Sequence, residues 1–280
     1  MDSGRTGVRT AALLLPPMLW LGVAYLGALA ALLITAFWSQ DDFTGQIQRI
    51  WTLDNFRELF TVPVYRTITV RTLSIAALVT VVDALLALPI ALYMAKVASP
   101  RAQRLLVIAV LMPLWASYLV KAYAWRGMLS EGGLLDWLLA PVGLQSPGYG
   151  LTATTITLAY LWLPYMILPV FAGLQRLPDS LLEASSDLGA HSWTTLRRVV
   201  LPMAFPALVA GSIFTFSLSM GDFIAVTIVG GTSQLLGNVV YNNVGAANNL
   251  PFAAAVATIP VVVMLVYLAV VRRTGALENL

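Results

Sequence analysis

Long apolar runs separated by shorter polar segments form the main pattern of this sequence. A helix that crosses a bilayer core needs roughly 20 residues, and six stretches are long enough while holding at most one charged residue inside them. These stretches cover residues 11–38, 72–95, 105–125, 151–175, 201–229 and 251–271. The pattern predicts an all-α membrane protein with six transmembrane helices, which together form a single transmembrane domain over residues 1–280.

Two of the polar segments between these spans have features of their own. Leu53–Phe60, ahead of the second span, has the pattern of an amphipathic helix at the membrane interface. The segment 176–200 joins the fourth span to the fifth. Lys and Arg are more numerous on the side of the membrane that holds this segment and both termini, so the positive-inside rule places that side in the cytoplasm.

The composition narrows the possible functions. Of the 280 residues, 59% are hydrophobic and 10% are charged, so lipid is the solvent for most of the chain. Without cysteine and with a single histidine, His191, the chain lacks the residues for a thiolate metal site and for a histidine-based site. The net charge is +3, and the basic residues are scattered at the ends of the spans, which argues against nucleic acid as a partner. No glycine-rich phosphate loop occurs, so we do not expect this chain to bind ATP by that route. We also expect that the chain is not an enzyme and that it holds no cofactor.

The segment 176–200 carries signals for two short helices. Ser180 and Glu183 have the spacing of a capping box, which starts a helix, and Ser192 can cap a second one. Gly189 lies between them and permits a turn that a residue with a Cβ atom resists. We therefore expect two short helices that meet at Gly189 and lie along the membrane surface, although an ordinary amphipathic connector between spans is the alternative interpretation.

This segment resembles a known motif. Glu183-Ala184, Gly189, Val199 and Leu201-Pro202 resemble the Glu-Ala-Ala loop of permease subunits in binding-protein-dependent ABC importers, with Ser185 in place of the second Ala. The resemblance implies a coupling loop that docks on a separate ATPase chain. The residues that it assigns to this loop are Glu183, Ala184, Ser185, Asp187, Leu188, Gly189 and His191.

Two carboxylates lie inside the predicted spans, where a charge costs roughly 3 kcal/mol at the centre of a helix. Asp83 is about midway between Arg71 and Lys96, near the middle of the second span. Asp222 is about 30 Å beyond Pro202 along a helix, and therefore lies toward the external face. Each carboxylate is a candidate for the substrate path.

Helical spacing gives these carboxylates polar and aromatic neighbours. Thr215, Ser219 and Asp222 follow one another on one face of the fifth span, and Tyr118 shares a face of the third span with Lys121 and Trp125. The candidates for the substrate path are therefore Asp222, Asp83, Trp125, Tyr118, Ser219 and Thr215. The alternatives are simple helix packing for the hydroxyl side chains and a structural ion pair between Asp222 and Lys121.

A second resemblance concerns the substrate. Residues 113–125, 161–169 and 220–223 are similar to the first permease subunit of spermidine/putrescine importers, a family that usually has Glu at Asp222 and Arg at Lys121. A carboxylate among aromatic rings also suits an organic cation. The resemblance implies a polyamine as the small cationic substrate of this chain.

The two resemblances together imply a permease that works by alternating access in the lipid of the bacterial plasma (inner) membrane. The implied partners are a second permease that forms a heterodimer, two ATPase subunits that bind ATP and Mg²⁺, and an external substrate-binding protein. Other interpretations of the function stay open. The same machinery could carry another small solute, such as a phosphonate, ferric iron or thiamine. A proton-coupled secondary carrier would need no ATPase, and a non-transporting membrane anchor would need no acid in its spans.

Overall fold

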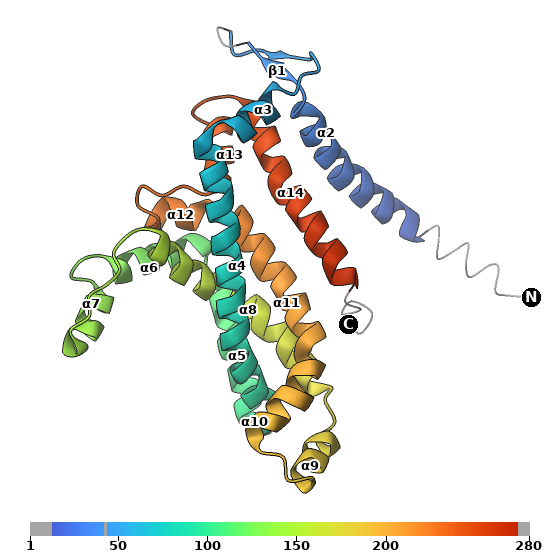
Figure 1. The fold of residues 1–280 in the computed structure, drawn as a ribbon, viewed down its shortest axis with the longest axis vertical. Helices are drawn as coiled ribbons and strands as arrows, with labels where there is room; N and C mark the ends of the chain where they lie inside the picture. The colour runs from blue at the N-terminus through green and yellow to red at the C-terminus, as the bar shows by residue number, and fades with distance from the viewer. Residues whose placement is uncertain (1–12, 42–43, 274–280) are drawn as a thin grey trace, which may run out of the picture. The chain divides into compact units, whose positions relative to one another are not determined.

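The computed structural model describes residues 13–41 and 44–273, and it is dominated by helices (Figure 1). A short hairpin pairs β1 (Ser39–Gln40) with β2 (Ile47–Gln48) in antiparallel orientation. The helices are η1 (Gly22–Leu26), α2 (Gly27–Thr35), α3 (Asp54–Thr61), α4 (Pro63–Leu92), η2 (Tyr93–Val97), α5 (Pro100–Trp115), α6 (Tyr118–Leu129), α7 (Leu134–Leu139), η3 (Ala140–Val142), α8 (Leu151–Gln175), α9 (Asp179–Asp187), α10 (Ser192–Thr195), η4 (Leu196–Val200), α11 (Leu201–Gly221), α12 (Ile224–Val229), α13 (Leu236–Val244) and α14 (Leu250–Arg273).

Length and hydropathy identify the helical runs that can cross a membrane. Within residues 13–41 and 44–273, five runs qualify, and a sixth is counted if the bent pair α5 and α6 is taken as one span. The five runs are Leu13–Thr35, Pro63–Val97, Leu151–Gln175, Ser192–Gly221 and Leu250–Arg273. The predicted all-α membrane fold is confirmed.

The predicted third span, 105–125, is wrong as a continuous helix. α5 and α6 meet at an angle of 95°, and the two residues between them, Ala116 and Ser117, have extended backbone conformations. Pro113 lacks an amide hydrogen and so weakens the last turn of α5. α6 then buries Ala122 against α8 and α12 in a small apolar cluster, which holds it away from the direction of α5.

The predicted fifth span, 201–229, also contains a break. α11 ends at Gly221, Asp222 is extended, and a separate helix, α12, begins at Ile224. The second span, predicted at 72–95, is longer than expected, because α4 starts at Pro63, directly after the amphipathic helix α3, and continues through η2. Proline suits the first turn of a helix, where its missing amide hydrogen would have no partner.

The chain divides into two compact units. The first unit comprises residues 1–65 and 240–259. In its described part, Ala36 packs against Ala254 and Ala255, and the side chain of Asn55 donates to the carbonyl oxygens of Ala36 and Trp38 at 2.9 and 2.8 Å. These bonds hold the start of α3 against the residues that follow α2.

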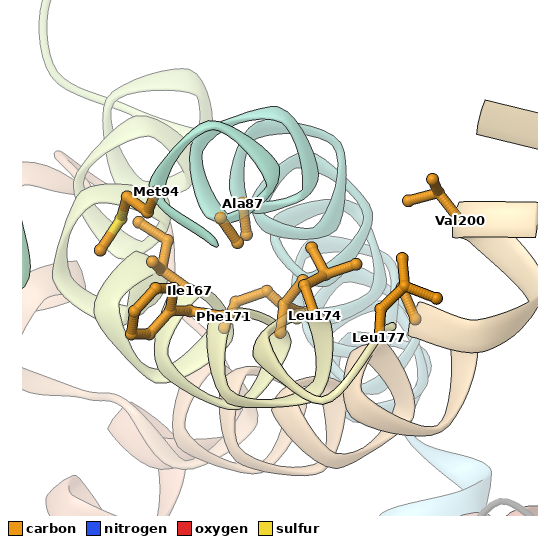
Figure 2. Packing of buried hydrophobic residues seen from close by; sticks show 11 residues of the cluster. Ala87, Met94, Ile167, Phe171, Leu174, Leu177 and Val200 are labelled. Carbon is orange, nitrogen blue, oxygen red and sulfur yellow. The ribbon is translucent and has the colours of Figure 1, made fainter. Parts of the chain in front are cut away.

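The second unit comprises residues 66–239 and 260–280 and contains the candidate site. Its largest apolar cluster joins α4 and α8 through Ala87, Met94, Ile167 and Phe171, among others (Figure 2). α8 and α11 approach closely, since a Cβ atom on Gly173 would lie 2.6 Å from that of Ala207 on α11. Small residues at such contacts allow close packing of membrane helices. Within this unit, α9 and α10 lie at one end of α8 and α11, and α6 and α12 lie at the other (Figure 1).

Candidate functional site

A pocket of about 280 Å³ opens where α11 ends. The break after Gly221 turns the backbone so that the Asp222 carboxylate faces this pocket instead of continuing the helix face that was predicted. The lining residues come from α6, α8, α11, the break and the start of α12, and they are Tyr118, Trp162, Ser217, Leu218, Gly221, Asp222, Phe223 and Ile224. The structure therefore brings together two of the predicted substrate-path residues, Tyr118 and Asp222.

Asp222 is only 8% exposed, and each of its carboxylate oxygens accepts a hydrogen bond. The Tyr118 hydroxyl donates to Oδ2, and the backbone amide of Ala225 donates to Oδ1 at 2.9 Å. The second bond satisfies an amide in the first turn of α12, as an N-cap side chain does. A carboxylate has about four acceptor positions, so acceptor capacity is left for a ligand in the pocket.

The proposed ion pair of Asp222 with Lys121 is absent from the part of the chain that the structure describes. Tyr118, one helical turn before Lys121, occupies that position and contributes a neutral donor. The sequence pattern missed this because Tyr118 and Lys121 share one face of α6 and both could have reached α11.

The break beside Asp222 is held by Asn238 on α13. Its side-chain amide donates to the carbonyl oxygen of Phe223 at 3.1 Å and to the Thr227 hydroxyl at 2.9 Å. Next to it, Gly237 passes so close to the break that a Cβ atom there would lie 2.9 Å from the carbonyl oxygen of Gly221. The first turn of α13 therefore fixes the shape of the break that lines the pocket.

Aromatic rings extend from the pocket along α8. The ring centroids of Tyr118 and Trp162 are 5.9 Å apart, and those of Trp162 and Tyr165 are also 5.9 Å apart. Phe214 on α11 follows at 6.4 Å from Tyr165. The negative faces of such rings attract organic cations, so this row is chemically suited to the same ligand class as Asp222.

The other predicted path residues lie outside the pocket lining. Trp125 packs against Tyr160 at 5.4 Å between ring centroids. Thr215 and Ser219 are fully buried, and the Thr215 hydroxyl bonds back to the carbonyl oxygen of Gly211 at 3.3 Å. For Trp125 and Thr215 the contacts seen are those of helix packing, the alternative that the sequence left open, whereas the buried Ser219 hydroxyl has no hydrogen-bond partner.

Asp83 has an environment quite different from that of Asp222. It is 0% exposed inside the continuous helix α4, and neither of its carboxylate oxygens has a hydrogen-bond partner. The face of α4 that contains it lies toward the interior, since Thr72, Ala76 and Ala87 are buried as well. In this conformation no substrate can reach Asp83.

The segment 176–200 forms the two short helices expected of it, α9 and α10. Gly189 lies between them with φ +74°, in the left-handed region that favours glycine. The predicted capping box is wrong: α9 already begins at Asp179, so Ser180 lies inside the helix and cannot cap it. Ser192 is likewise the first residue of α10 and not its cap.

One side-chain bond joins the two short helices. The Ser185 hydroxyl is 2.8 Å from the Thr195 hydroxyl. An alanine, the usual residue of the resembling motif at this position, could not make this bond. Nearby apolar side chains face outward, with Leu188 88% and Trp193 70% exposed. The loop therefore combines an internal brace with an apolar surface, as a docking element needs.

Sequence reasoning left Ser217 and Trp162 out of the proposed site, although both line the pocket. Ser217 and Gly221 are one helical turn apart, and this pair of small residues on one face was the available signal. Within the described residues, no cluster of three or more His, Cys, Asp or Glu side chains could hold a metal ion.

Comparison with known families gives a clear match. Residues 75–274 match the model of the family described as binding-protein-dependent transport system inner membrane component. An inner membrane ABC transporter permease protein of Escherichia coli, YdcU, is 45% identical over 96% of this chain and 90% of its own length. The spermidine/putrescine transport system permease protein PotB of Haemophilus influenzae is 33% identical over 81% of each chain.

Solved structures agree on the fold. A chain of a bacterial ABC transporter that imports the acidic polysaccharide alginate is 18% identical and superposes with a TM-score of 0.74, covering 97% of each chain. A chain of a methionine ABC transporter in an inward-facing conformation gives a TM-score of 0.55 over 75% of this chain and 93% of its own. At these identities the likeness concerns the fold alone.

Proposed function

The chain belongs to the family of inner membrane components of binding-protein-dependent transport systems, and we propose that it carries a polyamine through the membrane. The family is one of ABC importer permeases, so the chain is a transport component and not an enzyme. The proposal concerns the substrate and the way in which transport is driven.

The observation that carries the substrate proposal is the buried carboxylate of Asp222 in an aromatic pocket. A charge in a poorly hydrated pocket attracts an ammonium group more strongly than it does in water, where unit charges at 4 Å gain only about 1 kcal/mol. Tyr118 and Trp162 add aromatic surface beside this carboxylate. The names of relatives such as the PotB permeases support a polyamine within this class of cations.

The segment 176–200 is proposed as the coupling loop, through which an ATPase subunit drives the spans. It lies at the opposite end of α8 and α11 from α6 and α12 (Figure 1), two helices that contribute to the pocket lining, as transmission across a membrane requires. Its exposed Leu188 and Trp193 offer apolar surface to that partner. In the proposed arrangement both termini and this loop are cytoplasmic, and the pocket receives substrate from an external binding protein. A second permease completes the path, in line with the match of a PotC permease over 45% of this chain.

The experiment is transport by the complete complex in liposomes, with the ATPases and the binding protein. Labelled spermidine and putrescine should enter only with ATP, and they should stimulate ATP hydrolysis, whereas thiamine or a phosphonate should do neither. Uptake that needs a proton gradient but no ATPase would identify a secondary carrier and would overturn the coupling proposal. Stimulation by another solute but not by polyamines would overturn the substrate proposal alone.

A further inference from the structure

One basic side chain ties the proposed coupling loop to the end of the second span. The Lys96 ammonium donates to Asp179 Oδ1 at 2.7 Å and to the carbonyl oxygen of Leu177 at 2.5 Å. Lys96 closes the helical run that starts with α4, Leu177 follows α8, and Asp179 is the first residue of α9. A single cation therefore joins three helices of the second unit.

The charges suit the helix ends that meet there. Helices carry partial negative charge at the C-terminus and partial positive charge at the N-terminus. Lys96 binds a carbonyl group just beyond the C-terminus of α8, and the Asp179 carboxylate lies in the first turn of α9. The Lys96 side chain is only 11% exposed, whereas the Asp179 side chain is 75% exposed, so the pair lies at the surface with its cation held inside.

The helix winding sets the direction of Lys96. Residues Tyr93–Val97 form the π-turn η2, in which the amide of Ala98 donates to the carbonyl oxygen of Tyr93 at 2.9 Å. A π-turn holds one more residue than an α-turn, and one residue corresponds to about 100° of rotation around the axis. The π-turn therefore changes the direction in which Lys96 leaves the helix, compared with ordinary α winding.

A second π-turn, η4, leads from α10 into α11 and borders the same place. Met94 of η2 and Val200 of η4 belong to one apolar cluster with Leu174 and Leu177 (Figure 2). Leu182 of α9 packs against this cluster from the loop side. The helical run that starts with α4 therefore ends in a π-turn beside the Lys96 contact, and α11 is preceded by another one. Such turns are frequent at functional sites.

We propose that Lys96 is a positioning residue for energy coupling: its bonds to Leu177 and Asp179 make α9 and the end of α4 move together. The inference rests on the proposed role of the 176–200 loop. A force on α9 then reaches α4 directly through Lys96, in addition to its route through η4 and α11. Without Lys96, ATP hydrolysis continues, but less of it drives transport.

The test is the number of ATP molecules hydrolysed per polyamine transported by the complete complex in liposomes. Lys96→Met keeps most of the apolar stem and removes the charge, and it should raise this ratio on the order of tenfold, within the usual range of coupling between sites. Asp179→Asn should raise it less, because the bond of Lys96 to Leu177 remains. Lys96→Arg, which keeps the charge, should stay near the wild-type ratio.

Arg101→Met is the matched control. Arg101 is an exposed basic residue in the first turn of α5, close in sequence to Lys96, and its loss should leave the ratio unchanged. A variant that only lowers the amount of folded protein reduces both rates together and does not change their ratio. If Lys96→Met prevents assembly, the ratio measured for Asp179→Asn tests the proposal instead. A wild-type ratio for Asp179→Asn would then overturn the proposal.

Gly189→Val separates this inference from the proposal on which it rests. If Gly189→Val uncouples hydrolysis from transport while Lys96→Met has the wild-type ratio, only the role of Lys96 is wrong. If neither substitution changes the ratio, the 176–200 loop is not the coupling element.

Discussion

The two ends of α8 and α11 differ in whether the side chains there find partners within the chain. At the pocket end, Asp222 is bound by Tyr118 and by the start of α12, and the break in the chain is braced by Asn238. At the loop end, Leu188 and Trp193 face outward with most of their surface uncovered. The Asp222 carboxylate and the break thus find their hydrogen-bond partners within one chain, whereas the loop end presents a surface for a partner.

This difference predicts opposite sensitivities. Substitutions at the loop end should leave the fold intact and should weaken coupling to the partner, because few contacts within the chain depend on those residues. Substitutions at the pocket end should change both the local structure and the passage of substrate. The following predictions test that contrast.

The largest effect is expected from Gly189→Val. A left-handed backbone costs a residue with a Cβ atom roughly 1–2 kcal/mol, and no atom lies within 4 Å of a Cβ atom built there, so the penalty comes from the backbone alone. The turn should open, and polyamine uptake should fall to background while the protein still inserts. Uptake assays with quantified membrane expression provide the measurement.

Gly143→Val is its control. Gly143 has φ +69° and an equally open surrounding, but it lies in the loop after α7. The same backbone strain there should leave uptake near the wild-type rate. Equal losses for the two variants would mean that strain itself, and not the place of Gly189, lowers transport.

For Asp83→Leu we expect a smaller effect, which is a gain in thermal stability and not a loss of uptake. A buried polar group without a hydrogen bond costs on the order of 1–3 kcal/mol, so an apolar side chain of similar size should raise the thermal stability of the purified protein. Uptake should be unchanged, because Asp83 is sealed inside the chain. Loss of uptake with normal stability would show that substrate reaches Asp83 in another conformation.

The smallest effect is expected for Ser185→Ala. A hydrogen bond between neutral groups contributes about 1 kcal/mol, and this substitution removes the bond to Thr195 that links α9 with α10. Coupling should weaken slightly. Combining Ser185→Ala with Thr195→Val should weaken it little further, because both substitutions remove the same bond. Ser186→Ala, next to it on the exposed side of α9, should have no effect. Additive losses from Ser185→Ala and Thr195→Val would show that the bond is unimportant.

The sequence predicted most spans because each is a long apolar run, a property independent of tertiary contacts. The 176–200 loop was predicted as well, since Gly189 and the motif around it are local signals. The angle between α5 and α6 could not be predicted, because it depends on α6 packing against α8 and α12, which are distant in sequence.

The site could be predicted only in part, again because some of its contacts join residues that are distant in sequence. Asp222 was found because a carboxylate in an apolar run is conspicuous. The alternative of a structural ion pair named Lys121, because charge pairing was the available criterion, whereas the geometry after the Gly221 break selects Tyr118. The contact of Lys96 with Asp179 joins residues that are distant in sequence, and it is made from a π-turn for which no local pattern was recognised.

The most direct test of the account is polyamine uptake by Asp222→Asn. Asparagine keeps the shape and the acceptor for the Ala225 amide, so it removes the charge while α12 stays capped. We expect transport to weaken about tenfold, which corresponds to about 1.4 kcal/mol, with Asp222→Glu retaining most activity. Tyr118→Phe serves as the control that removes the hydrogen bond to Asp222 and keeps the charge. Equal uptake by the wild-type protein and Asp222→Asn, at equal expression, would contradict a role for the Asp222 charge in selecting a cation.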